Sequence, residues 1–175
     1  KTDPEDTALF FNLNEENTYW LDDISVVLVP PQDTRPPIVG NQVLNGSFEV
    51  GIDKWCATFR EWGISGDLAD ESNSTAMLTS VEVQNAPHGK RALAFPVRGG
   101  CQVALNSGYF PLRYGHPATA SVWMNAPSAG KRFTFKIAHG LFPNITVVGE
   151  KGFTSTKAGW EQYTLPFTPG LSSSK

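Results

Sequence analysis

Apolar and polar residues alternate with a period of two along much of this chain. The clearest alternation covers residues 91–97, 102–105, 118–125 and 133–137. Successive side chains of a β-strand point to opposite faces of a sheet, so this period predicts strands that bury one face. No window spaces its apolar residues three and four apart over the length of a helix. The pattern therefore predicts an all-β chain.

Further strands are predicted toward both ends of the chain. Residues 8–12 and 18–29 are rich in aromatic and β-branched residues, and the polar segment between them favours a turn, which together predict a hairpin. Near the other end, strands are predicted around Val147, Phe153 and residues 163–167. Short strands at intervals of roughly ten residues are typical of a β-sandwich or jelly roll.

A proline-rich segment separates the predicted hairpin from the rest of the chain. Residues 30–37 hold four prolines in eight positions, which excludes a helix interior or a central strand and favours an extended spacer. Beyond it, residues 43–50 are predicted to form a strand, and residues 53–85 to form strands around an exposed loop. We therefore expect a closing hairpin over 1–30, a linker over 31–40, and the main body of the same β-sandwich over 41–175.

The order of these segments is unusual. Residues 17–25 have the character of a strand that closes a domain, yet they precede residues 45–49, which have the character of an opening strand. If residues 1–30 are placed after Lys175, the strands and turns form one continuous series. The sequence predicts a sandwich that is circularly permuted or cut out of phase from a tandem array.

Composition narrows the class of protein. The 175 residues are 40% hydrophobic, 11% aromatic and 18% charged, as expected of one folded domain with a substantial core. The formal net charge of −3 provides no basic surface for phosphates, so nucleic acid is not an expected partner. No apolar stretch approaches the roughly 20 residues of a membrane span, so no membrane partner is expected.

Cysteines and glycosylation motifs bear on where the protein acts. Cys56 and Cys101 have no metal-binding spacing, which leaves one disulfide or two free thiols. Asn-x-Ser/Thr acceptor motifs begin at Asn45, Asn73 and Asn144, and they have meaning only in a secreted protein. We therefore expect an extracellular, secreted location.

Six short motifs are spread over nearly the whole chain outside the linker. They are Asn45-Gly46-Ser47-Phe48-Glu49 with Gly51 and Trp55, Ala86-Pro87-His88-Gly89-Lys90, Ser121-Val122-Trp123-Met124-Asn125-Ala126, Gly159-Trp160, Phe167-Thr168, and Trp20-Leu21-Asp22-Asp23-Ile24-Ser25. In this cyclic order they resemble the carbohydrate-binding modules of the family 4, 9, 16 and 22 type. The resemblance implies a jelly roll without catalytic activity, a sugar-binding cleft on one sheet, attachment to polysaccharide-degrading enzymes, and often a structural calcium ion.

The resemblance also implies which residues would hold calcium. The family's two carboxylates map onto Glu49 and Asp22, and its main-chain carbonyls map near Gly46, His88 and Arg91. Calcium takes six to eight oxygen ligands, so carbonyls must complete such a site. The alternative for both acids is a solvated position on the surface or at the end of a strand.

Sugar binding usually combines exposed aromatic faces with amide and hydroxyl groups. Trp62 lies in the least strand-like region and is the leading candidate for a platform. Trp123 is a second candidate, with Gln102 expected on an adjacent strand of the same sheet and core packing as the alternative for Trp123. Phe142 and His139 lie in a stretch expected to carry loops. The other tryptophans are predicted to pack in the core: Trp20, Trp55 and Trp160.

Catalytic patterns are weak. The histidines, His88, His116 and His139, all stand next to Gly or Pro, and the adjacent acids Asp22 and Asp23 would point to opposite faces of a strand. We therefore expect no enzymatic activity and favour a noncatalytic module that binds a polysaccharide and targets an attached catalytic domain to it. The alternatives are an assembly repeat completed by strand addition from neighbouring repeats and, less favoured, a small glycan-cleaving enzyme.

Overall fold

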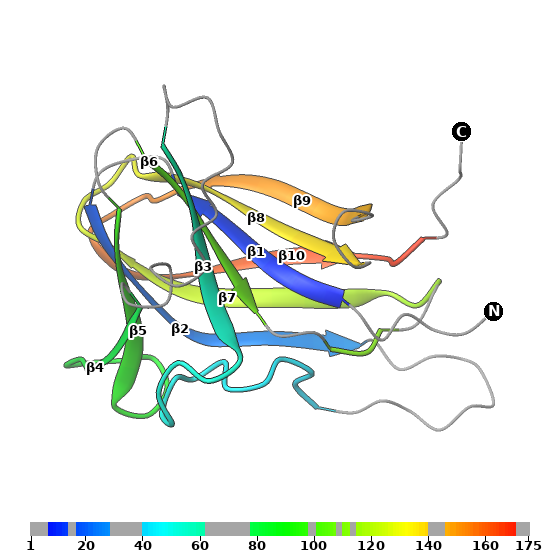
Figure 1. Cartoon of the computed structure of the whole chain (residues 1–175), viewed down its shortest axis with the longest axis horizontal. Coiled ribbons are helices and arrows are strands. Elements are labelled where there is room, and N and C mark those ends of the chain that lie inside the picture. The colour runs from blue at the N-terminus through cyan, green and yellow to red at the C-terminus, as the bar shows by residue number, and fades with distance from the viewer. Residues whose placement is uncertain are drawn as a thin grey trace.

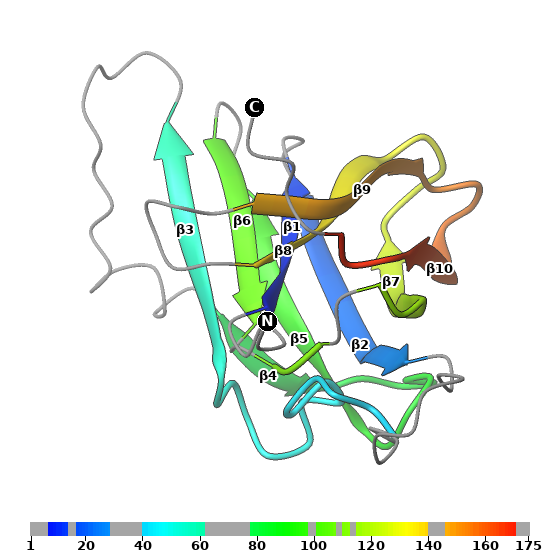
Figure 2. The same ribbon diagram turned by 90° about the vertical axis from the view of Figure 1, so that its right-hand side faces the viewer.

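The computed structural model describes residues 7–13, 17–28, 40–61, 78–97, 101–107, 110–112, 115–139 and 146–170. Within these ranges the regular structure is entirely β-strand (Figures 1 and 2). The strands are β1 (Thr7–Leu13), β2 (Asn17–Leu28), β3 (Trp55–Glu61), β4 (Thr79–Glu82), β5 (Arg91–Val97), β6 (Cys101–Ser107), β7 (Ala118–Ala126), β8 (Arg132–His139), β9 (Thr146–Thr154) and β10 (Gly159–Phe167). No helix in these ranges has the length and apolar character that crossing a membrane requires.

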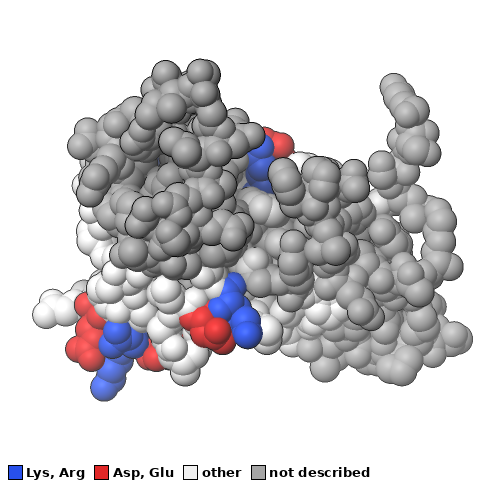
Figure 3. All heavy atoms as spheres, in the orientation of Figure 1, with Lys and Arg blue, Asp and Glu red and all other residues white. Residues whose placement is uncertain are grey.

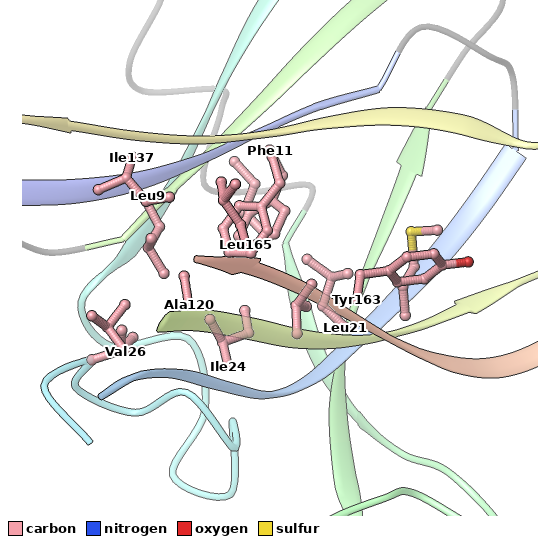
Figure 4. Close-up of a cluster of buried hydrophobic side chains, with 14 of the residues drawn as sticks. Leu9, Phe11, Leu21, Ile24, Val26, Ala120, Ile137, Tyr163 and Leu165 are labelled. Atoms are coloured by element: carbon pink, nitrogen blue, oxygen red, sulfur yellow. The ribbon is translucent and has the colours of Figure 1, made fainter. Parts of the chain in front are cut away.

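Two antiparallel five-stranded sheets pack face to face. Sheet A has the order β3-β6-β1-β8-β9, and sheet B has the order β10-β7-β2-β5-β4. Figure 4 shows side chains from the two sheets, among them Phe11 and Ile137 of sheet A and Leu21 and Leu165 of sheet B, meeting in one core. The predicted all-β sandwich is confirmed.

The strand order explains why strands with the character of closing strands come first in the chain. Counted from β3 to β10 and then through β1 and β2, the path passes from one sheet to the other at each step except within the hairpins β4–β5 and β8–β9. This alternation is that of a jelly roll. The first two strands take central positions, because β1 lies between β6 and β8 and β2 lies between β5 and β7.

The predicted hairpin over residues 1–30 is wrong. Both strands form, but β1 belongs to sheet A and β2 to sheet B, so they do not pair with each other. A pattern of strand, polar segment and strand is the same whether the chain turns back within a sheet or crosses to the other sheet. Each strand here gains two neighbours by crossing, which pairs both of its edges.

The predicted strand over residues 43–50 is also wrong. Residues 44–47 and 49–50 form turns, and Asn45 and Phe48 have φ angles of 51° and 57°, which are incompatible with a strand. The segment lies beside β2, where the Ile24 N–H donates to the Gly46 carbonyl at 2.9 Å. Phe48 is fully buried all the same, with its ring centroid 5.2 Å from that of Trp55. The proline-rich linker lies outside the described residues except for Gly40.

The predicted period of two is confirmed where it was clearest. Buried and partly exposed residues alternate along the whole of β7. In β8, Phe133, Phe135 and Ile137 are buried, while Thr134 and Lys136 are partly exposed. The predictions around Val147 and Phe153 belong to one strand, β9.

The pairing of β3 with β6 decides between the two states of the cysteines. Cys56 is opposite Asn106, and Cys101 is opposite Glu61, so the cysteines occupy opposite ends of this strand pair. Five residues of strand separate them by about 17 Å along the pair. A disulfide needs Cα atoms within about 7 Å of each other. In this fold Cys56 and Cys101 are therefore not bonded to each other.

Candidate functional site

The first candidate site is centred on a buried carboxylate. The pairing of β2 with β7 shifts register between Asp22 and Ser25, and Asp23 has a φ angle of 46°. This β-bulge bends the strand locally. The Asp22 side chain is fully buried, with Oδ1 accepting the Asp23 N–H at 2.7 Å and Oδ2 accepting the His88 N–H at 2.8 Å.

A second carboxylate binds the same turn from another direction. Glu49 Oε1 accepts the N–H groups of Arg91 at 2.7 Å and Lys90 at 3.0 Å. Gly89 permits this approach, since a Cβ there would lie 2.5 Å from the Glu49 carboxyl carbon and the residue has a φ angle of +69°. Asp22 and Glu49 thus both contact residues 88–91, which we call the 88–91 turn.

The remaining residue predicted to bind metal lies close by. Gly46 packs directly on β2, where a Cβ would lie only 2.0 Å from the Ile24 carbonyl oxygen. Ile24 lies two residues after Asp22 in β2, so Gly46 is held close to that acid. In Figure 3, acidic and basic side chains gather at the end of the molecule where Figure 1 places β4 and β5. The structure brings Glu49, Asp22, Gly46, His88 and Arg91 into one region.

The two acids have opposite electrostatic environments. Burial raises the pKa of Asp22 from 3.8 to about 6, although the N–H groups of His88 and Asp23 act in the other direction. Hydrogen bonds from the backbone of Arg91 and Lys90 lower the pKa of the exposed Glu49. Among the described side chains no lysine or arginine forms an ion pair with Asp22, because the Arg91 guanidinium instead contacts Ser80 and Glu82.

These residues fit a calcium ion of the kind that the resemblance implies. Asp22 is a buried carboxylate that forms no ion pair with a described lysine or arginine, and a bound cation would stabilise its charged form. In the described part of the chain no three His, Cys, Asp or Glu residues cluster around a metal position, so main-chain carbonyls such as that of Gly46 would supply the other oxygens. Such an ion would join the β2 bulge to the 88–91 turn.

The second candidate site is a row of aromatic side chains on the outer face of sheet B. Trp20 of β2 and Trp160 of β10 both lie opposite Asn125 of the intervening strand β7. Trp123 follows in the next row, opposite Asp22 on one side and Gln162 on the other. All three tryptophans are partly exposed, whereas Val122 and Met124 beside Trp123 in β7 are buried.

The surroundings of these tryptophans are neutral and polar. The amides of Asn125 and Gln162 lie between or beside the rings, and the next row holds Thr164, Ser121 and Ser25. The hydroxyls of Ser25 and Ser121 are hydrogen-bonded at 2.7 Å. We call Trp20, Trp123, Asn125, Trp160 and Gln162 the tryptophan face. Among the residues paired in its two rows the ionisable one is the buried Asp22, and the partly exposed Asp23 lies in the adjacent bulge of β2.

One polar atom of the tryptophan face has no internal partner. The Trp160 indole N–H is buried and forms no hydrogen bond with any described residue. An unsatisfied buried donor costs about 1–3 kcal/mol relative to a hydrogen-bonded one.

The predicted sugar-binding residues that lie in described strands do not share one sheet. Trp123 lies in β7 of sheet B, whereas Gln102 lies in β6 of sheet A, so the expectation that they share a sheet is wrong. His139 pairs with Thr7 at the start of β1. Gln102 directly precedes Val103, which pairs with Leu13 at the other end of β1. His139 and Gln102 therefore lie at opposite ends of this strand. The side chains of Gln102 and His139, and all of Trp62 and Phe142, lie outside the described residues.

Sequence reasoning missed two members of the tryptophan face. Trp20 and Trp160 were expected in the core, but only Trp55 of those three is buried there. A signal was present in β2, since Trp20 stands between Tyr19 and Leu21, which the period of two assigns to the opposite face. Both neighbours are fully buried.

One glycosylation motif begins at an asparagine whose side-chain amide is already hydrogen-bonded within the protein. The Asn45 amide nitrogen donates to the carbonyls of Gly51 at 2.9 Å and Asp53 at 3.0 Å. A glycan on that nitrogen would remove at least one of these hydrogen bonds. Asn73 and Asn144 lie outside the described residues.

Comparisons with known proteins leave the family open. No protein-family model and no curated protein matches the chain. One solved structure that matches is a DUF4425 family protein from Bacteroides ovatus ATCC 8483, with 9% sequence identity over 94% of this chain and 96% of that one. Its TM-score of 0.26 is too low to bear on fold or function.

Proposed function

We propose that this chain is a noncatalytic carbohydrate-binding module, which binds a polysaccharide on one sheet face and holds an attached protein near it. The observation that carries the proposal is the tryptophan face. Its aromatic rings can stack on the apolar C–H faces of sugar rings, and its amides and hydroxyls can bond sugar hydroxyls. The motif resemblance supports the same function.

The described rows of this face hold no lysine or arginine and one buried acid, which favours a neutral ligand. Charged partners are recognised by complementary potentials, which exposed lysines, arginines or acids would supply. The described charged contacts lie elsewhere, as in the pairs Lys136–Glu150 on sheet A and Arg91–Glu82 beside the 88–91 turn. The proposed module acts outside the cell on a neutral polysaccharide, next to an appended enzyme or wall protein.

Calcium has a structural part in this proposal. Bound between Asp22, Glu49 and nearby carbonyls, the ion would neutralise the buried acid and fix the bulge of β2. Trp123 lies opposite Asp22 in the strand pairing, so the same region supports one edge of the tryptophan face.

Affinity electrophoresis and calorimetry against β-glucans, xylan, mannan and algal polysaccharides test the proposed function. We expect retardation and measurable heat on at least one neutral polymer. The same samples, assayed for new reducing ends, should release none. The proposal is wrong if no polymer in this panel retards the protein or produces heat.

A further inference from the structure

The strand pairing of the tryptophan face sets the spacing of the two backbone positions that carry its outer rings. Trp20 and Trp160 occupy one row across sheet B, since both pair with Asn125. Neighbouring strands lie about 4.8 Å apart, so two strand spacings place their backbones about 10 Å apart. The line joining them runs perpendicular to the strands.

This spacing matches one kind of sugar chain. In an extended β-1,4-linked glycan, every second sugar ring recurs at a spacing similar to that of alternate strands, which is about 10 Å. Successive rings of such a chain are turned over, so alternate rings present the same face to a surface. Trp20 and Trp160 can therefore stack on the first and third rings of a trisaccharide unit, with Asn125 beneath the second.

A ligand that lies along the strands would contact fewer aromatic side chains. Along β7 the outward positions that follow Trp123 are Ser121 and Thr119, which have no ring for stacking. A ligand lying along the strand would contact one tryptophan, whereas a ligand lying across the strands contacts two. Trp123, about 7 Å further along β7, borders the second ring of the ligand that lies across the strands.

We propose that the tryptophan face binds an extended, neutral β-1,4-linked glycan whose chain runs across β2, β7 and β10, with Trp20 and Trp160 stacked on alternate sugar rings. This assignment rests on the proposed function and specifies its site and ligand class. A β-1,3-linked glucan coils rather than extends, so it cannot keep alternate rings over both tryptophans. Among the described residues paired in its two rows no lysine or arginine is present, so an anionic glycan finds no cationic partner there.

Calorimetry with oligosaccharides tests the ligand class. We expect β-1,4-linked glucose, xylose or mannose oligomers to gain affinity steeply from the disaccharide to the trisaccharide and little beyond the tetrasaccharide. A β-1,3-linked glucose hexamer should bind at least tenfold more weakly, since it loses one stacked ring. Equal affinity for the two linkages would overturn the assignment.

Variants test the site. We expect Trp20→Ala and Trp160→Ala each to weaken binding roughly tenfold or more, because aromatic anchors dominate such contacts. Lys136→Ala, on the outer face of sheet A, is the control and should bind normally, and Trp62→Ala tests the alternative platform. Loss of binding in Trp62→Ala with full binding in the other two would overturn the assigned face while leaving the proposed function intact. If wild type binds none of the polymers, the proposed function itself fails.

A measurement on the wild-type protein avoids any loss of folding in these variants. The chain has five tryptophans, whose indole N–H groups give separate NMR signals that single Trp→Phe variants assign. Adding a β-1,4-linked hexasaccharide should shift the signals of Trp20, Trp123 and Trp160 and leave that of the buried Trp55 in place. Shifts confined to Trp62 would contradict the proposed face.

Discussion

At the scale of single residues, the burial of Asp22 makes the stability of the protein depend on pH. Its pKa is raised from 3.8 to about 6 by burial, so the folded state holds the proton more tightly than the unfolded state does. Without a bound cation, the contribution of Asp22 to the stability of the protein is therefore most favourable below about pH 4 and is lost as the pH rises through about 6. Two pKa units correspond to about 3 kcal/mol.

Thermal melts in chelator between pH 4 and pH 7 measure this effect. The quantity to follow is the difference in stability between wild type and Asp22→Asn, because it isolates the contribution of this side chain. We expect the stability of wild type to fall relative to the variant as the pH rises. A difference that stays constant with pH would show that Asp22 does not titrate in this way.

Gly46 gives a second prediction at this scale. A Cβ at this position would lie 2.0 Å from the Ile24 carbonyl oxygen. That oxygen belongs to the backbone and a Cβ is bonded directly to Cα, so neither atom can rotate away. We expect Gly46→Ala to lose about 3 kcal/mol in chemical denaturation. Gly152→Ala is the control, because a Cβ there meets nothing within 4 Å. Equal stability of the two variants would contradict the observed packing.

At the scale of elements, the 88–91 turn is held by two carboxylates, Asp22 of the β2 bulge and Glu49 of the segment that packs beside β2. A calcium ion that binds only the folded protein would raise its melting temperature by mass action. We expect chelator to lower the melting temperature of wild type and to leave an Asp22→Asn, Glu49→Gln double variant unchanged. Glu82→Gln is a control that should keep the response, since Glu82 contacts Arg91 and neither candidate carboxylate. No response of wild type to chelator would dismiss calcium.

At the scale of the whole molecule, the first two strands complete both sheets. β1 pairs with β6 and β8, and β2 pairs with β5 and β7, so removing them would open a gap in the middle of each sheet. We expect a chain that begins at Asn41 to be insoluble or unfolded by circular dichroism. A well-folded truncation would show that residues 1–30 are dispensable for this sandwich.

The same arrangement predicts the oligomeric state. Because β1 and β2 pair within their own chain, no strand from a neighbour is needed to fill either sheet. We expect a monomer by light scattering across a range of concentrations. A concentration-dependent dimer would favour the alternative of an assembly repeat that exchanges strands.

The sequence by itself determined which residues of the most regular strands face the core. The period of two in 118–125 and 133–137 depends only on local backbone geometry, and the structure follows it closely. It also indicated that the chain starts with strands that belong at the end of a jelly roll, because motif order can be read along the chain.

Only the tertiary structure decided which strands are neighbours. Pairing joins residues far apart in the chain, and local patterns carry no information about the partner; hence β1 and β2 were wrongly predicted to form a hairpin. For the same reason the predicted sugar residues separate, with Trp123 in sheet B and Gln102 and His139 in sheet A. Trp20 and Trp160 form one row because both pair with Asn125, a relation that exists only once the sheet is formed.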